Sequence, residues 1–147
     1  MQDSRRVWVF DLDDTLHDAS SHIFPIMNKA MTQYIMDTLD LNEHHAFELR
    51  KHYWRIYGAT LKGLMRHHGI DPYHFLCKTH DHMDLENMVT EIKQLRHCIN
   101  NLKGRKVIFT NAPMNYAIRV LDTLGITDLF SLVFSVESTK FHPKPSV

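Results

Sequence analysis

The sequence of 147 residues is poor in the residues that mark several protein classes. Its two cysteines, Cys77 and Cys98, lie far apart and form no CxxC pair, which indicates free thiols in a reducing compartment. No apolar run approaches the ~20 residues that a membrane helix needs. Residues 1–6 lack the long apolar region of a signal peptide. These absences together predict a cytoplasmic protein without a membrane anchor.

The sequence also lacks an excess of charge of either sign. Lys and Arg together number 17, as do Asp and Glu, so the formal net charge is zero and no global basic field exists to bind nucleic acid. Hydrophobic residues make up 44% and charged residues 23%, an ordinary globular composition that excludes a disordered or fibrous chain. The length fits one domain with a sizeable core.

Three apolar segments predict strands of a parallel sheet. Residues 7–10 are apolar without alternation and end abruptly at a run of aspartates. Residues 105–111 repeat this design, with a basic start, an apolar centre and a polar end, and residues 129–136 form a third candidate. Continuous apolar runs are typical of strands that are buried on both faces.

Helical spacing predicts the elements between these strands. A helix starting near Pro113 and ending at Gly125 separates the second and third strands, which gives a right-handed βαβ unit. Residues 20–102 are predicted to be helical, and residues 88–102 to form the last helix of this block. The pattern predicts an α/β fold, a Rossmann-like parallel sheet with an inserted helical cap. The core comprises residues 1–17 and 97–147, and the cap residues 18–96.

The polar residues that follow the strands predict a site for phosphoryl transfer. Ligands of open α/β sheets bind at the carboxyl ends of the strands, where Asp11, Asp13, Thr110, Asn111 and Lys144 converge. One carboxylate can attack phosphorus while a second, two residues on, moves the proton. The hydroxyl and ammonium groups can hold phosphate oxygens, and Mg²⁺ can offset the negative charge.

These motifs resemble those of the haloacid dehalogenase-like (HAD) hydrolases. Asp11-Leu12-Asp13-Asp14-Thr15 is similar to their DxDx[TV] motif, Phe109-Thr110-Asn111 to their second motif, and Lys144-Pro145 to their third. The resemblance implies that Asp11 is the nucleophile and Asp13 the general acid/base, and that the Asp11 carboxylate and the Asp13 carbonyl bind Mg²⁺. It also implies that Thr110 and Lys144 bind phosphate, that Asn111 borders the phosphate, and that Thr15 supports the loop.

The cap resembles that of the pyrimidine 5′-nucleotidase branch of this superfamily, over residues 57–64, 68–72 and 80–81. This implies hydrolysis of pyrimidine nucleoside 5′-monophosphates. Tyr57 and Thr60 are candidate substrate contacts, because Gly58 lets the backbone approach a ligand closely. The alternatives are a general phosphatase of another small phosphometabolite, a phosphomutase or a dehalogenase. Asp13 argues against dehalogenation, which has no leaving-group alcohol to protonate.

The family's fourth motif, with further metal-binding acids, has no counterpart before Val147. We therefore expect either a fragment of a longer protein or a natively truncated chain without activity, which would act as a binding module. In the family's strand order, the strand at residues 7–10 would then be an apolar edge, which favours self-association.

Local structure offers a simpler interpretation of several candidate residues. Asp14 is expected to cap the following chain rather than to react. Two of the twelve histidines, His80 and His82, flank Asp81, but no HxxxH pattern with a glutamate is present. Solvated histidines on helices and loops are therefore expected rather than a zinc site.

Overall fold

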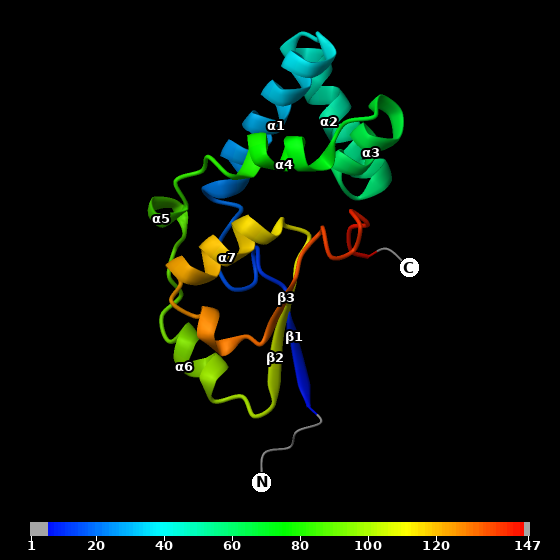
Figure 1. Ribbon diagram of the computed structural model, residues 1–147. Coiled ribbons are helices and arrows are strands. Elements are labelled where there is room, and N and C mark those ends of the chain that lie inside the picture. Colours follow the sequence, from blue (N-terminus) through cyan, green and yellow to red (C-terminus); the bar gives the residue numbers. More distant parts are fainter. Residues whose placement is uncertain (1–5, 146–147) are drawn as a thin grey trace.

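The computed structural model describes residues 6–145, whose strands form one parallel sheet (Figure 1). Strands β1 (Val7–Phe10), β2 (Arg105–Phe109) and β3 (Leu132–Phe134) lie in that order, and both neighbouring pairs are parallel. The α/β fold with a parallel sheet is thus confirmed. The ends of the predicted core, residues 1–5 and 146–147, lie outside the described residues.

Helix α7 (Met114–Thr123) connects β2 to β3 and packs on one face of the sheet. It starts after Pro113 and ends before Gly125, whose φ of 64° fits the predicted left-handed position. Strand β3 is shorter than the predicted 129–136. The chain first makes a 3₁₀ turn, η1 (Thr127–Leu129), and turns again after Phe134.

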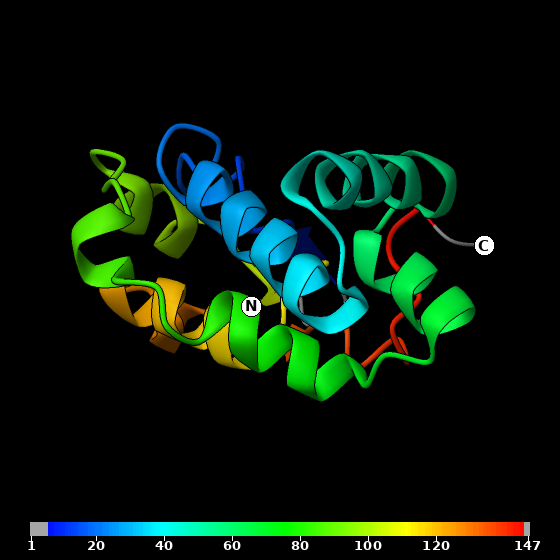
Figure 2. The same cartoon turned by 90° about the horizontal axis from the view of Figure 1, so that it is seen from above.

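Four helices between β1 and β2 form the layer above the strand ends in Figure 1, and Figure 2 shows this layer from above. They are α1 (Ile23–Leu39), α2 (Glu43–Tyr57), α3 (Thr60–His68) and α4 (Pro72–His80). The sequence specifies two of their starts directly: the side chain of Asn42 accepts from the His45 N–H, and that of Asp71 from the Tyr73 N–H. The predicted helical insertion is therefore present.

The predicted helix over residues 88–102 is wrong. The structure has two short helices, α5 (Leu85–Met88) and α6 (Leu95–Asn100), separated by an irregular segment. Val89 is extended and Gln94 has a φ of 65°, which a continuing helix does not permit. The intervening segment contains three β-branched residues, which favour extended backbone. Met88, Leu95 and Ile99 still pack on the core, whereas Ile92 of the same apolar spacing is 42% exposed.

Buried side chains form two clusters. The first joins the sheet and α7 to Leu12 and to Ile23 and Met27 of α1. The second lies within α1–α4 and includes Val136 from the segment after β3. Helix α1 therefore contributes to both clusters, and the boundaries predicted for core and cap stay a prediction.

The sheet face opposite α7 exposes apolar side chains. Val7 and Val9 of β1 are 51% and 62% exposed, and Leu132 and Phe134 of β3 are 43% and 44% exposed. The register aligns Val9, Val107 and Leu132, so these residues share one face. Self-association was predicted at the edge of β1, which lies at one edge of the sheet among the described residues, and it stays a prediction.

Two further findings concern the described residues alone. Both cysteines are exposed free thiols. Within residues 6–145, no helix has the length and apolar character required to cross a membrane.

Candidate active site

The predicted site residues from the three strand ends lie in one place. Asp11 directly follows β1, Thr110 directly follows β2, and Lys144 lies in the segment that continues from β3 towards the helical layer (Figure 1). The Lys144 ammonium donates a hydrogen bond of 2.9 Å to Asp11 Oδ1. Residues separated by 133 positions in the chain therefore form an ion pair at the carboxyl end of the sheet.

Lys144 is held by groups from the end of β2. Its Nζ also donates to the Phe109 carbonyl at 2.6 Å. The side chain of Asn111 brackets the Lys144 backbone: Oδ1 accepts from the Lys144 N–H at 2.7 Å, and Nδ2 donates to the Lys144 carbonyl at 3.3 Å. The Asn111 side chain thus holds the backbone of Lys144 in place. Its predicted position beside a bound phosphate stays a prediction.

The ion pair remains accessible to solvent, since the Asp11 and Lys144 side chains are 47% and 29% exposed. The Thr15 hydroxyl lies 3.5 Å from Asp11 Oδ2, in agreement with a supporting position. Thr110 is only 2% exposed, and its oxygen accepts from the Ala112 N–H at 3.0 Å. The predicted contact of Thr110 with phosphate would therefore use its hydroxyl proton as the donor.

Asp13 has different surroundings from Asp11. Its Oδ1 accepts from the Tyr116 hydroxyl at 2.6 Å and contacts His17 Nε2 at 2.8 Å. Burial, followed by the charge of Asp13, raises the pKa of Tyr116 far above its usual value, so this hydroxyl stays a donor. The Asp11 carboxylate therefore contacts an ammonium group and is exposed to solvent. The Asp13 carboxylate contacts a hydroxyl group and an imidazole instead.

Asp14 has the structural position that the sequence predicts. Its Oδ1 accepts from the backbone N–H groups of Ala19 and Ser20, at 3.0 and 2.9 Å. The hydrogen bond from the Ser20 hydroxyl is the largest of the effects that lower the pKa of this carboxyl. Asp14 also has a φ of 57°, a conformation that aspartate tolerates better than most residues.

The contacts of four residues around the site were not predicted from the sequence. Tyr116 is in the core as predicted, but its hydroxyl contacts Asp13, and His17 was not considered. Both oxygens of Glu137 accept from the Met114 N–H at the start of α7. His80 was expected to be solvated, which is wrong, because it is 4% exposed and packs edge-on against Tyr116. The i, i+4 spacing of Asp13 and His17 was the one available signal.

The two candidate cap residues differ in accessibility. Thr60 is 5% exposed and donates to the Arg50 carbonyl at 3.0 Å, so its hydroxyl is not available to a ligand. Tyr57 is half-buried at the end of α2, next to Gly58, which approaches Pro143 beside Lys144. The Tyr57 hydroxyl pairs with His67 Nε2 at 2.6 Å. Of these two residues, only Tyr57 has a side chain that a ligand can reach.

The buried His80 makes stability depend on pH. Burial lowers the pKa of His80 from 6.5 to about 4, so below pH 6.5 the unfolded chain binds more protons and stability falls. We expect a loss of about 2 kcal/mol in unfolding free energy between pH 7 and pH 5. Urea unfolding at pH 7 and at pH 5 measures this difference in unfolding free energy. His80→Gln should remove most of this difference, whereas substitution of the exposed His44 by Gln should not. An unchanged pH dependence in His80→Gln would contradict the assignment.

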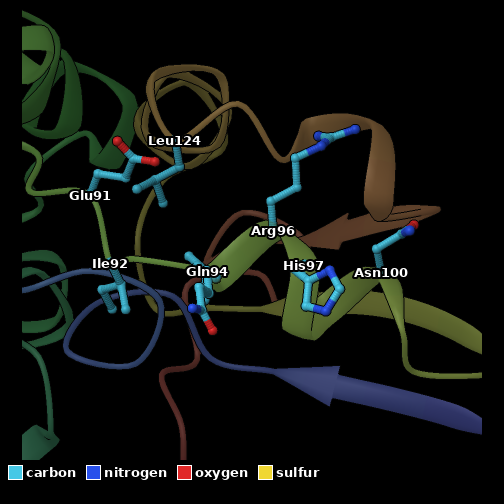
Figure 3. Close-up of a pocket in the computed structure, with 8 residues that line it drawn as sticks. Glu91, Ile92, Gln94, Arg96, His97, Asn100 and Leu124 are labelled. Atoms are coloured by element: carbon cyan, nitrogen blue, oxygen red, sulfur yellow. The ribbon is translucent and has the colours of Figure 1, made fainter.

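A surface pocket lies away from the candidate site. A surface pocket of about 460 Å³ is formed by α6, the segment before it and Leu124 (Figure 3). Arg96, one of its lining residues, is engaged by both oxygens of Asp128, each at 2.7 Å. Helix α6 lies far from the carboxyl ends of the strands in Figure 1, so this pocket is separate from the candidate site.

The fold and the site define an α/β protein with two carboxylates and a lysine at the carboxyl edge of a parallel sheet. The family model described as haloacid dehalogenase-like hydrolase matches residues 8–147. The chain therefore belongs to the haloacid dehalogenase-like hydrolase family.

The chain is also similar to a curated yeast protein and to solved structures. Phosphate metabolism protein 8 of Saccharomyces cerevisiae is 30% identical over 135 residues, which cover 86% of this chain and 42% of the yeast protein. The chain thus spans less than half the length of this curated relative. Similar solved structures include L-2-haloacid dehalogenase from Xanthobacter autotrophicus (17% identity, 95% of this chain and 59% of the other, TM-score 0.49). Another is the HAD-hydrolase YfnB from Bacillus subtilis bound to magnesium (17% identity, 96% and 67%, TM-score 0.47).

Proposed function

We propose that the protein is a Mg²⁺-dependent phosphate-monoester hydrolase that acts through an aspartyl-phosphate on pyrimidine nucleoside 5′-monophosphates. The observation that carries this proposal is the 2.9 Å pair of Asp11 and Lys144, with a second carboxylate, Asp13, two residues on. The name of the yeast relative, which refers to phosphate metabolism, supports phosphate chemistry.

In the first step, an oxygen of Asp11 attacks phosphorus and the bond between phosphorus and the leaving oxygen breaks. The leaving oxygen keeps the electron pair and takes a proton from Asp13. Lys144 neutralises charge on the phosphate that Asp11 attacks, because its ammonium already lies against Asp11. Thr110 offers its hydroxyl proton to the same anion.

In the second step, water attacks the phosphorus of the aspartyl-phosphate. Asp13, now ionised, takes a proton from this water, and the bond between phosphorus and the Asp11 oxygen breaks. Inorganic phosphate leaves, Asp11 is a carboxylate again, and Asp13 has regained its proton. One residue thus serves as acid and then as base, which requires that its free oxygen remain reachable throughout.

The donors at the site fit Mg²⁺ in kind. The Asp11 carboxylate and the Asp13 carbonyl are hard oxygen donors, and Mg²⁺ is commonly held by one or two carboxylates together with substrate phosphate. Residues 6–145 contain no group of three or more His, Cys, Asp or Glu that could hold a metal ion by itself. When bound, Mg²⁺ would supply positive charge to the phosphate and reduce its repulsion by Asp11.

The nucleotide preference rests on the cap above Lys144. Tyr57 is a half-buried aromatic ring whose neighbour Gly58 lies against Pro143, one residue before the phosphate-binding lysine. A base attached to a phosphate at Lys144 could therefore stack on this ring. Small sugar phosphates have no such group and would gain nothing from Tyr57.

A substrate panel tests the proposal. We expect kcat/KM for UMP and CMP to exceed that for ribose 5-phosphate by about tenfold, the selectivity that one aromatic contact can supply. Comparison with AMP and GMP tests the preference for pyrimidines separately, because purines also stack on an aromatic ring. Activity should vanish on chelation and return with Mg²⁺. Tyr57→Ala should erase the preference, whereas Trp54→Ala, which removes a 65% exposed ring on the same helix, should keep it.

The outcomes separate the alternatives. Equal rates on all compounds would leave a general phosphatase and remove the proposed role of Tyr57. Binding of phosphate without hydrolysis would favour a binding module instead. Preference retained in Tyr57→Ala but lost in Trp54→Ala would place the base against Trp54 instead of Tyr57.

A further inference from the structure

A buried cluster of polar side chains is centred on Asp13. The Tyr116 hydroxyl and His17 Nε2 both meet Oδ1 of this carboxylate, at 2.6 and 2.8 Å. Neither of these two contacts uses Oδ2, and the Asp13 side chain is 16% exposed. The Tyr116 hydroxyl donates to Oδ1, and so does His17 Nε2 when it carries the ring proton; Oδ1 can accept both whether or not Oδ2 holds a proton.

The two donors come from different elements and cannot move independently of the core. Tyr116 lies on α7, has no exposed surface, and its ring packs edge-on against His80 of α4, with centroids 5.9 Å apart. His17 follows Asp13 by four residues and is 1% exposed. The Asp13 carboxylate is therefore fixed by groups that are themselves immobilised by packing.

Stability alone does not account for this cluster. His17 Nδ1 is buried without a hydrogen-bond partner among the described residues, which is an energetic cost that an apolar side chain would avoid. A tyrosine hydroxyl in a fully buried helix face also needs a partner that phenylalanine would not. Costly buried polar groups beside a reactive carboxylate are typical of functional sites.

We propose that Tyr116 and His17 are positioning residues for Asp13, which hold one carboxylate oxygen by two donors so that the other is presented for proton transfer. This inference rests on the proposed phosphatase function. Without these donors, the carboxylate can rotate about its side-chain bonds, and the fraction of molecules with a correctly placed Oδ2 falls. The two residues act through Asp13 and do not touch substrate.

Kinetics on a series of aryl phosphates test this role. A poor leaving group needs the proton from Asp13, whereas a strongly activated one does not. Tyr116→Phe should lower kcat/KM by about 10- to 100-fold for phenyl phosphate, the scale of one hydrogen bond to a carboxylate. For the most activated aryl phosphate the loss should be less than about threefold. The variant Asp13→Asn should show the same dependence on the leaving group, and adding Tyr116→Phe to it should cost little more.

Matched variants separate positioning from loss of structure. Tyr34→Phe removes another buried tyrosine hydroxyl, which pairs with His74 in the helical layer, and should leave both rates unchanged. His17→Gln keeps an N–H donor and should lose less activity than His17→Leu. An equal loss on every leaving group, or full additivity with Asp13→Asn, would overturn the proposal.

A measurement without substrate separates this inference from the proposed function. Three-bond NMR couplings to the Asp13 carboxyl carbon should indicate one side-chain rotamer in the unmodified protein and averaging in Tyr116→Phe and His17→Leu. An unchanged single rotamer in both variants would refute positioning even if the protein hydrolysed nothing. A failed substrate assay with averaged rotamers would instead refute only the phosphatase function.

Discussion

Asp11→Asn is expected to lower phosphate-monoester turnover by about 10⁴- to 10⁶-fold, the loss typical of removing a covalent nucleophile. An amide oxygen is a far weaker nucleophile than a carboxylate, and the variant also loses the negative partner of Lys144 at 2.9 Å. Because Asp11 is 47% exposed, the substitution buries no new polar group, and folding should be little affected. Steady-state assays with UMP, together with a thermal unfolding profile, measure both quantities.

Two controls make this result specific to the nucleophile. Asp18→Asn, seven residues along the same loop, removes a carboxylate that accepts from Ser21, and it should retain turnover. Beryllium fluoride, which mimics a phosphoryl group on an aspartate, should be trapped by the unmodified protein but not by Asp11→Asn. Near-normal turnover in Asp11→Asn would rule out the aspartyl-phosphate.

Isotope labelling distinguishes the chemistry within the family. A single turnover in H₂¹⁸O should place the label in phosphate, because water attacks the phosphorus of the intermediate. Label recovered in the Asp11 carboxylate would mean that water attacks the carboxyl carbon of an ester intermediate, as dehalogenation requires. The same experiment thus tests the alternative that Asp13 already argues against.

The strand ends were predictable from the sequence because their signals are local. Each apolar run stops at a polar residue, and the geometry of parallel sheets then requires the carboxyl ends to lie together. Lys144 lies ten residues beyond the end of β3, so its place beside Asp11 was predictable through the resemblance of Lys144-Pro145 to a family motif and not from the strand ends alone. The left-handed position of Gly125 was likewise set by its own backbone preference.

The surroundings of Asp13 could not be predicted in the same way. Tyr116 occupies a core position of α7, and apolar spacing reveals burial but not the direction of a hydroxyl. His80 was misassigned because histidine is common on surfaces, and only the packing of α4 against α7 shows that it is enclosed. The helix predicted over 88–102 is wrong for a related reason. The spacing of apolar residues indicates which side chains can pack on the core, but it does not specify the backbone conformation between them.

Asp13→Asn is expected to lower kcat on UMP by about 10²- to 10⁴-fold, the contribution of a positioned general acid and base. Asparagine keeps an oxygen for the Tyr116 hydroxyl but has no proton to give and cannot take one from water. Both chemical steps should slow, whereas Asp11 can still attack. An activated aryl phosphate should therefore produce an initial burst of phenol, followed by slow turnover as the aspartyl-phosphate accumulates.

Acid quenching after the burst measures this intermediate directly, since a phosphorylated protein should be recovered from Asp13→Asn and scarcely from the unmodified chain. Asp14→Asn is the matched control at the adjacent residue. Its carboxylate holds the backbone of Ala19 and Ser20, so the substitution should reduce stability without trapping an intermediate. A burst in Asp14→Asn but not in Asp13→Asn would exchange the roles of the two residues. Slow turnover of the activated aryl phosphate by Asp13→Asn with no burst would mean that attack by Asp11 itself is slowed, which would contradict the assignment of Asp13 as general acid and base.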